Sequence, residues 1–497
     1  MCEVSTITTT NTTTEYPITY IDEDKIYLGR WCLNVAGYTV HKGNDISSPS
    51  SYCSKKEYRF NEGTVKIFYS PQFSHGQDVR AVTKIPEDKI SRIPETVILF
   101  NCDGHGAYSA GKNCAVEAPE FISKNFVKHT KHLFSRLFMR TDYERFIEKK
   151  ELQKSINKLF KEYDEYFLEK FKNSGGSTCT MKVFILDPIL DYLHIYDITL
   201  GDSPSLNICL ESLKVEENNF SQNCDCKEGV QHWLNTSFKD SKDNLKPPKV
   251  VLGRFNTKPY GRIINILNFM KDKSSKLKMI DVYDTKQNSD GCWNLDISET
   301  LKEFYKKCPE TYKVKLLQQG GVQTLRDKEK FKKEYLGGGF PTYNFGNTIE
   351  GHGQNLGTFG DGNKKIKHRL HCEPLIKHSE IKDKPRKIYL IGSDGVCDVN
   401  TDKNLIESFT NVEIKDGDSY IKSCCEKLFK NTLNKGRDAK WRTRNNFGVW
   451  DDQSAWIIDI GCGYKLDKKV KIKKQNKFQK KKNKRRRRRL RKRFKKN

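Results

Sequence analysis

Short apolar runs that adjoin an acidic residue stand out in the pattern of hydrophobic and polar positions. Residues 97–106 read Val-Ile-Leu-Phe-Asn-Cys-Asp-Gly-His-Gly. A continuous apolar run of this length, closed by glycines, is typical of a buried strand. By itself, Asp103-Gly104 would indicate a hairpin turn, because Asp-Gly favours that geometry. Residues 386–398 repeat the construction, with an apolar run that leads into Asp394-Gly395, and this repeat favours a functional role.

A third run has the opposite order, because Asp451 and Asp452 precede a strand-like stretch at 453–458. Carboxylates at the ends of neighbouring strands can converge on one point. A buried carboxylate is costly unless it is paired or binds a cation. Magnesium and manganese prefer clusters of oxygen ligands. The pattern therefore predicts a metal site made of Asp103, Asp394 and Asp451.

Helix and strand patterns surround these runs. Residues 111–130 are expected to form a helix behind the Asp103 loop. A second helix with one buried face is predicted by apolar residues at steps of three and four, namely Leu152, Ile156, Leu159, Tyr163, Phe167 and Phe171. We interpret this stripe as core packing. Residues 179–186 and 192–200 are expected to form an antiparallel hairpin that leads into Gly201-Asp202-Ser203.

Changes in composition divide the 497 residues into three parts. Residues 1–57 contain a threonine-rich run and are expected to be partly disordered. Residues 58–463 carry the patterns of one domain, with a segment at about 204–319 that we interpret as an insertion of unknown role. Residues 464–497 form a Lys- and Arg-rich tail. The chain is long enough to bury a substantial core.

Positive charge is concentrated in that tail. It holds twenty-one Lys or Arg and one Asp, a net +20, whereas the whole chain carries +27. Such a segment is expected to stay disordered and to attract polyanions, so nucleic acid is a candidate partner. A nuclear-localisation signal and a solubilising tail explain the same composition. Base-specific recognition is not expected, because the aromatic residues Phe478 and Phe494 are isolated.

The sixteen cysteines are scattered and include no Cys-x-x-Cys motif. The N-terminus lacks the regions of a signal peptide, and no apolar run approaches the ~20 residues of a membrane span. We therefore expect an intracellular protein, nuclear or cytoplasmic, with reduced thiols and no membrane partner. Cys224 and Cys226 resemble half of a zinc site, but no second pair stands at finger spacing, and loop cysteines are the better interpretation.

Short motifs follow one another in a distinctive order between about residues 60 and 462. They are Gln77-Asp78, Asp103-Gly104-His105-Gly106, Gly176-Ser177-Thr178, Gly201-Asp202-Ser203, Gly320-Gly321-Val322, Phe359-Gly360-Asp361, Glu373-Pro374, Ser393-Asp394-Gly395-Val396-Cys397-Asp398 and Asp451-Asp452-Gln453-Ser454. This order resembles the metal-dependent protein serine/threonine phosphatases of type 2C. The resemblance implies an α+β fold, a four-layer α-β-β-α sandwich of two antiparallel sheets flanked by helices. It also implies hydrolysis of phosphoserine and phosphothreonine in proteins.

The resemblance further implies a metal site with two ions, Mg²⁺ or Mn²⁺. Asp103 would bridge them, and the carbonyl of Gly104 would be a further ligand. Asp394 and Asp451 would hold the first ion.

The remaining matched positions concern a third ion and the chemistry. Asp202 and Asp398, together with Asp394, match the ligands of a third, weaker ion. Asp78 matches an acid near the metal waters, and His105 matches a general acid. Two divalent ions lower the pKa of a bridging water, and hydroxide then attacks phosphorus in line. His105 would protonate the departing alkoxide.

The chain departs from the family pattern at several positions. The family usually places an Arg or Lys a few residues before the Asp78 motif to hold the substrate phosphate, and residues 70–75 contain neither. Arg80 or a residue of the insertion would have to replace it. Pro204 stands where Arg is common, and Asp452 stands where Asn is common.

Two other functions compete with an active type 2C phosphatase. A catalytically weak or dead phosphatase fold, acting as a binding module with a basic tail for nucleic acid, is favoured by the missing base and the long insertion. The presence of the metal-site acids and His105 favours an active enzyme instead. Cys53 and Arg59 have the Cys-x5-Arg spacing of cysteine phosphatases, but the residues between them include no glycine to open a phosphate loop, so this match is best explained by chance.

Overall fold

The computed structural model describes residues 22–40, 54–69, 77–106, 109–171, 175–224, 226–238, 247–252, 281–299, 302, 347–349, 355–383, 387–397, 400–410, 412–414, 418–438 and 452–462. The threonine-rich run, the motif at 320–322 and the basic tail at 464–497 lie outside these residues, as do Asp398 and Asp451.

The first sheet has six strands in the spatial order β1-β2-β20-β19-β11-β12, and every neighbouring pair is antiparallel. The strands are β1 (Asp22–Leu28), β2 (Trp31–Val40), β11 (Ser205–Cys209), β12 (Lys214–Glu217), β19 (Lys387–Gly392) and β20 (Gln453–Cys462). In β2 the buried Trp31, Leu33 and Val35 alternate with the partly exposed Cys32 and Asn34. This period of two lets a strand bury one face.

The second sheet has seven strands in the order β18-β10-β9-β6-β5-β4-β3, again antiparallel throughout. The strands are β3 (Ser54–Phe60), β4 (Gly63–Tyr69), β5 (Val79–Ile85), β6 (Thr96–Cys102), β9 (Cys179–Leu186), β10 (Leu193–Leu200) and β18 (Leu375–Ile381). All seven residues of β6 are buried, as its continuous apolar run predicts. The predicted hairpin is confirmed as β9 and β10.

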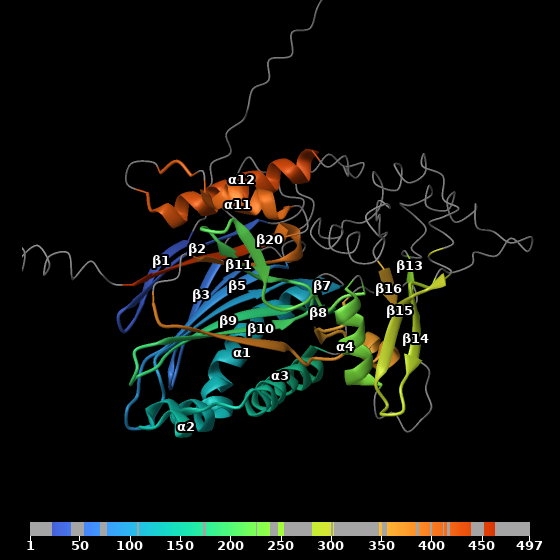
Figure 1. Cartoon of the computed structure of the whole chain (residues 1–497), viewed down its shortest axis with the longest axis horizontal. Helices are drawn as coiled ribbons and strands as arrows, with labels where there is room; N and C mark the ends of the chain where they lie inside the picture. The colour runs from blue at the N-terminus through green and yellow to red at the C-terminus, as the bar shows by residue number, and fades with distance from the viewer. Residues whose placement is uncertain are drawn as a thin grey trace, which may run out of the picture.

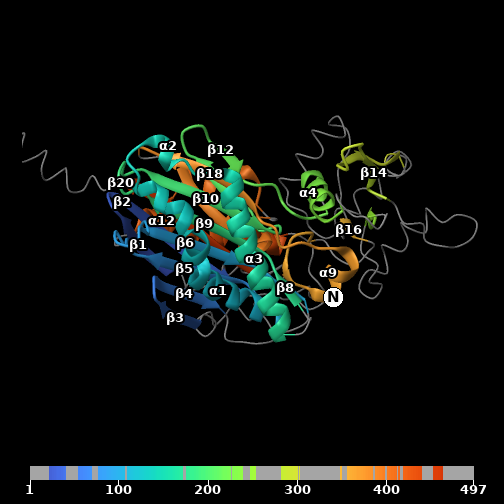
Figure 2. The ribbon, with the colours of Figure 1, turned by 90° about the horizontal axis from the view of Figure 1, so that it is seen from below.

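The two sheets pack face to face, and helices cover both outer faces (Figures 1 and 2). Helices α1 (Ser109–Phe134) and α3 (Lys149–Phe171) share a buried apolar cluster with the second sheet. Helices α11 (Asp402–Thr410) and α12 (Tyr420–Asp438) share another with the first sheet. A third cluster lies between the sheets and includes Trp31, Leu99 and Ile458. The predicted four-layer α-β-β-α sandwich is confirmed.

The apolar stripe predicted for the second helix forms the buried face of α3. Leu152, Ile156, Leu159, Tyr163 and Phe167 are all buried. The short η2 (Ser135–Phe138) and α2 (Asp142–Arg145) lie between α1 and α3 in the chain.

The main sheets extend beyond the limits expected for the domain core. The hairpin of β1 and β2 precedes residue 58, yet β2 pairs along its whole length with β20. Strands β11 and β12 fall inside the segment at 204–319, yet β11 pairs with β19. A charged strand such as β1, which begins Asp-Glu-Asp-Lys, carries little apolar signal because it lies at a sheet edge.

Most of the remaining elements come from the expected insertion and from the segment after it. Helix α4 (Lys227–Ser237) lies beside two small antiparallel strand pairs at the right of Figure 1. The first pair is β13 (Val250–Leu252) with β16 (Asn347–Ile349), and the second is β14 (Tyr283–Gln287) with β15 (Trp293–Ile297). The indole of Trp233 donates to the carbonyl of Arg369 at 3.1 Å and so ties α4 to the main domain.

A third, three-stranded sheet in the order β17-β8-β7 adjoins the ends of the main sheets. It consists of β7 (Gly104–Gly106), β8 (Gly175–Ser177) and β17 (Phe359–Gly360), and the short helices α9 (Gly362–His368) and α10 (Asp394–Cys397) follow β17 and β19. Within the described part of the chain, no helix combines the length and the hydropathy that a membrane span requires.

Candidate active site

The two main sheets are joined by hydrogen bonds at one end of the sandwich. The hydroxyl of Ser454, near the start of β20, lies 2.8 Å from Asp78 Oδ2 and 2.6 Å from Asn101 Oδ1. The indole of Trp456 donates to the carbonyl of Phe100 at 2.9 Å. The start of β20 in the first sheet therefore meets the start of β5 and the end of β6 in the second. Acidic motif residues from three separate parts of the sequence lie at this end.

Asp78 is the most deeply buried of these acids. Burial raises the pKa of its carboxyl well above the usual range, and the negative charges of Asp452 and Asp394 raise this pKa further. Hydroxyl hydrogen bonds from Ser393 and Ser454 oppose the rise. Asp78 Oδ1 is buried and has no hydrogen-bond partner among the residues that the structure describes. Such crowded carboxylates, one with an open oxygen, are a donor set that suits a hard divalent cation.

The Asp103-Gly104 step is held by backbone contacts from two sides. The carbonyl of Asp103 accepts hydrogen bonds from the Thr178 N–H at 2.9 Å and the Ser177 hydroxyl at 3.1 Å. The N–H of Gly104 donates to the carbonyl of Gln77 at 3.3 Å, and the N–H of Gln77 donates to Asp452 Oδ2 at 2.8 Å. These bonds connect the Asp103 loop to the carboxylates around Asp78.

Two features of the loop exclude the simple hairpin turn. Strand β6 pairs with β5 and β9, while β7, which begins at Gly104, pairs with β8. A Cβ atom on Gly104 would lie 2.6 Å from the carbonyl oxygen of Gly111 in α1. Glycine is required here because the start of α1 packs directly on the loop backbone.

The predicted metal ligands are only partly covered by the described residues. Asp103 and Asp394 follow β6 and β19 at the same end of the sandwich, while Asp451 and Asp398 lie outside the described residues. Within the described ranges, which leave out Asp451, no three His, Cys, Asp or Glu side chains are close enough together to hold a metal ion. The acids near Asp78 therefore do not form a complete metal site by themselves.

Asp202 lies on a loop that packs against the same region. A Cβ atom on Gly201 would lie 2.5 Å from Thr178 Cγ2, and the Ser203 and Thr178 hydroxyls are 2.9 Å apart. Since Thr178 also donates to the Asp103 carbonyl, the Asp202 loop adjoins the Asp103 loop.

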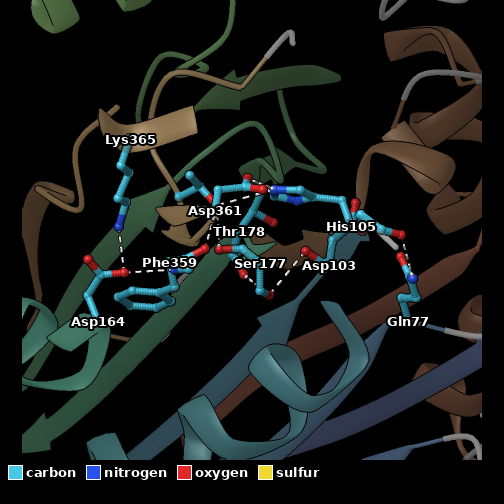
Figure 3. Close-up of polar contacts among 12 residues, drawn as sticks. Gln77, Asp103, His105, Asp164, Ser177, Thr178, Phe359, Asp361 and Lys365 are labelled. Atoms are coloured by element: carbon cyan, nitrogen blue, oxygen red, sulfur yellow. Dashed lines mark hydrogen bonds and ion pairs between the residues drawn. The ribbon is translucent and has the colours of Figure 1, made fainter. Parts of the chain in front are cut away.

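His105 contacts an acid for which the motifs indicate no role. Its Nε2 lies 2.5 Å from Asp361 Oδ2 (Figure 3). The hydroxyl of Thr358 lies 3.3 Å from the same nitrogen. The side chain of Asp361 is 6% exposed and that of His105 is 24% exposed. The pair joins the Asp103 loop to the turn that follows β17.

A side chain of α3, Asp164, holds the turn after β17. Asp164 Oδ1 accepts the N–H of Gly360 at 2.7 Å and forms an ion pair with Lys365 Nζ at 2.5 Å (Figure 3). Burial raises the pKa of Asp164, and the positive charge of Lys365 opposes this rise. Sequence reasoning missed both Asp164 and Lys365. Asp164 interrupts the apolar stripe of a helix, and a polar residue in a buried face is the one signal that could have identified it.

Arg80 does not replace the phosphate-binding base that residues 70–75 lack. Its side chain is fully buried between the sheets. Its Nε donates to Thr39 Oγ1 at 2.7 Å, its Nη2 pairs with Asp22 Oδ2 at 3.1 Å, and its guanidinium lies 4.6 Å from the ring centre of Trp456. Arg80 therefore stabilises the contact between the sheets. Residues 70–75 lie outside the described residues.

Comparison with known proteins yields structural matches. No protein-family model and no curated protein sequence matches the chain. Among solved structures, serine-threonine phosphatase 2C from Toxoplasma gondii matches with 12% identity over 82% of this chain and 99% of its own, at a TM-score of 0.43. The catalytic domain of the phosphatase PstP, in complex with two manganese ions, matches with 10% identity over 86% and 99%, at a TM-score of 0.32.

A third match is the PPM Ser-Thr phosphatase MsPP from Mycobacterium smegmatis, with 12% identity over 83% of this chain and 100% of its own, at a TM-score of 0.33. All three matched structures are serine-threonine phosphatases, and the chain is similar to each of them at low sequence identity.

Proposed function

We propose that this protein is a metal-dependent phosphatase that hydrolyses phosphoserine and phosphothreonine in proteins. The observation that carries the proposal is the crowding of Asp78, Asp394 and Asp452 at the end of the sandwich, next to the Asp103 loop. Carboxylates from separate elements repel one another, so their convergence is costly unless a cation neutralises it. Clusters of this kind are typical of functional sites.

The residues that would hold Mg²⁺ or Mn²⁺ are Asp103, the carbonyl of Gly104, Asp394 and Asp451, with Asp202 and Asp398 contributing to a third position. The open Oδ1 of Asp78 and the all-oxygen donor set support this assignment. When bound, divalent cations supply Lewis acidity and lower the pKa of water near neutrality.

The chain's own residues would prepare the site for this chemistry. The hydroxyls of Ser393 and Ser454 hold Asp78, which would then orient water molecules in the site. The backbone bonds of Ser177 and Thr178 fix the carbonyl of Asp103 and so the direction of its carboxylate. His105, at the edge of the loop, would give a proton to the alcohol oxygen that leaves phosphorus.

The test is phosphate release from phosphothreonine, phosphoserine and phosphotyrosine peptides by the full chain, with Mn²⁺ and with a chelator. We expect turnover on the first two peptides that stops on chelation, and a loss of ~10²-fold or more in Asp103→Asn. The absence of turnover on all peptides with either Mg²⁺ or Mn²⁺ would instead favour the non-catalytic binding module.

A further inference from the structure

We propose that Asp361 is the positioning residue for His105, and that Nδ1 is the ring atom from which His105 passes a proton to the leaving group. This inference rests on the proposed function. It concerns two residues that lie 256 positions apart in the chain and that Figure 3 shows in direct contact.

The contact decides which ring nitrogen carries a fixed proton. A carboxylate only accepts hydrogen bonds, so the 2.5 Å contact between Asp361 Oδ2 and His105 Nε2 places the hydrogen on Nε2. The neighbouring Thr358 hydroxyl donates to the carbonyl of Phe359 at 2.8 Å, and it lies further from Nε2, at 3.3 Å. Asp361 is therefore the main partner of Nε2 and orients the ring.

The other ring nitrogen, Nδ1, lacks such a partner in the part of the chain that the structure describes. His105 Nδ1 is buried and has no hydrogen-bond partner among the described residues. A buried polar atom that lacks a partner costs free energy, and a catalytic role or a bound water or ion is among the explanations for such an atom. Because Nε2 is engaged by Asp361, Nδ1 is the atom that remains for proton transfer.

Asp361 can orient His105 only if its own backbone is held. Asp361 adopts the left-handed conformation, with φ at 52°, which Asp tolerates better than most residues. Its N–H donates to the carbonyl of Gly175 at 3.0 Å, and its carbonyl accepts the N–H of Lys365 at 2.9 Å. The ion pair of Lys365 with Asp164 and the bond from Gly360 to Asp164 close the turn.

The proton transfer balances with these groups and the attacking hydroxide. The Nδ1–H bond of the imidazolium breaks, and its electron pair stays on the ring. The attacking hydroxide forms a new bond to phosphorus as the P–O bond to the serine or threonine oxygen breaks. An O–H bond forms on that oxygen, so the alcohol leaves neutral. His105 is left neutral with its remaining proton on Nε2, and Asp361 accepts the hydrogen bond from this N–H.

The first experiment compares Asp361→Asn with His105→Gln on a phosphothreonine peptide and on nitrophenyl phosphate. Asn also tolerates the left-handed conformation, so the turn is preserved. We expect both variants to lose ~10²-fold in kcat on the peptide, whose leaving group needs a proton, and less than threefold on nitrophenyl phosphate, whose leaving group does not. Asp361→Asn should cost nothing further in the His105→Gln background.

Asp191→Asn is the matched control. Asp191 has the same residue type and conformation, with φ at 56°, and forms an ion pair with Arg30 at 3.1 Å, remote from the site. The Asp191→Asn variant should keep the wild-type ratio of activity on the phosphothreonine peptide to activity on nitrophenyl phosphate. Equal losses on both substrates in Asp361→Asn, or losses that add in the double variant, would show that Asp361 acts on folding or metal binding and overturn the proposal.

The second experiment needs neither turnover nor a variant at Asp361. Full-length protein with ¹⁵N-labelled histidine, loaded with Mg²⁺, reports the tautomer of each neutral imidazole by its nitrogen shifts, and His105→Gln assigns the signal. We expect the Nε2–H tautomer for His105. The Nδ1–H tautomer would overturn the inference even if the protein proves to be an active phosphatase. The Nε2–H tautomer would support the inferred geometry even if the protein shows no phosphatase activity.

Discussion

Asp78 combines full burial with a carboxylate whose charged form is disfavoured. Its pKa is raised first by burial and then by Asp452 and Asp394, so the ionised group destabilises the metal-free protein at neutral pH. Asp78→Asn removes one charge from this cluster. We expect the unfolding temperature in chelator to rise in the variant, while metal-dependent turnover falls ~10–100-fold.

The measurement is a pair of thermal melts in chelator and in Mn²⁺, with turnover on the same preparations. The isosteric change at the exposed Asp383, just after β18, is the control and should move neither melt. A lower melting temperature for Asp78→Asn in chelator would contradict the electrostatic argument and indicate that the hydrogen bond from Ser454 matters more.

The sequence identified some of these residues and not others, for physical reasons. Asp103 and Asp394 could be predicted because each follows a continuous apolar run, and both lie where the main sheets meet. The contact of His105 with Asp361 could not be predicted, because it depends on a left-handed turn after β17 and not on local periodicity. The alternative role for Arg80 was wrong, because Trp456 and Asp22 hold its guanidinium between the sheets.

At the scale of elements, one ion pair joins α3 to α9. Asp164 and Lys365 have side chains 9% and 13% exposed. Lys365→Met would leave Asp164 buried with its main cationic partner removed, and we expect the free energy of unfolding to fall by ~3 kcal/mol. Asp164→Asn in the same chain should recover part of the loss, since the unpaired charge is then removed.

Chemical denaturation of the three proteins measures these changes. Lys124→Met is the control, because Lys124 and Glu120 form an exposed pair on α1 that is worth ~0.5 kcal/mol or less. Equal losses at Lys124 and Lys365 would show that burial does not strengthen the pair.

A second element-scale feature is the histidine pair on β10 and β18. His194 Nδ1 lies 3.1 Å from His378 Nε2. Burial and then the neighbouring His194 lower the pKa of His378 to about 4, while the negative charge of Glu380 opposes the drop. A histidine whose pKa is lowered by folding binds its proton more readily when unfolded. The contribution of neutral His378 to the free energy of unfolding is therefore present above the unfolded pKa of ~6.5, and it is lost as pH falls towards 4.

We expect His378→Gln to flatten the pH dependence of stability between pH 6.5 and pH 4. Denaturation midpoints at several pH values measure the slope, and His132→Gln, at an exposed position of α1, is the matched control. An unchanged slope in His378→Gln would mean that the pair is not linked to folding in this range.

The sheet order shows what the sequence could and could not predict about elements. The buried β6, the hairpin of β9 and β10, and α3 follow from apolar runs and periodicity. Strands β1 and β12 are edge strands with few buried residues, so no clear apolar pattern marks them. Which strands neighbour each other depends on pairing between distant segments, such as β2 with β20, and periodicity does not contain that information.

At the scale of the whole molecule, the basic tail is expected to be separable from catalysis. The last described strand, β20, ends at Cys462, before the tail begins at residue 464. A chain truncated after Gly463 keeps all described elements. We expect unchanged turnover on a short phosphothreonine peptide and a loss of salt-dependent binding to DNA or RNA.

A binding titration at several salt concentrations, next to the peptide assay, measures both properties on the full and truncated chains. Unchanged nucleic-acid affinity after truncation would place the basic site in the body of the protein. A collapse of peptide turnover would show that the tail belongs to the catalytic domain.

The central claim is that the carboxylates at the end of the sandwich bind a divalent cation that catalysis requires. The most direct test titrates the metal-free full chain with Mn²⁺ while calorimetry measures binding and phosphate release from a phosphothreonine peptide measures turnover. We predict that binding and turnover rise over the same Mn²⁺ range, that both are lost in Asp394→Asn, and that both persist in Asp296→Asn, an exposed acid of β15. Turnover without any metal, or Mn²⁺ binding that survives Asp394→Asn unchanged, would contradict the claim.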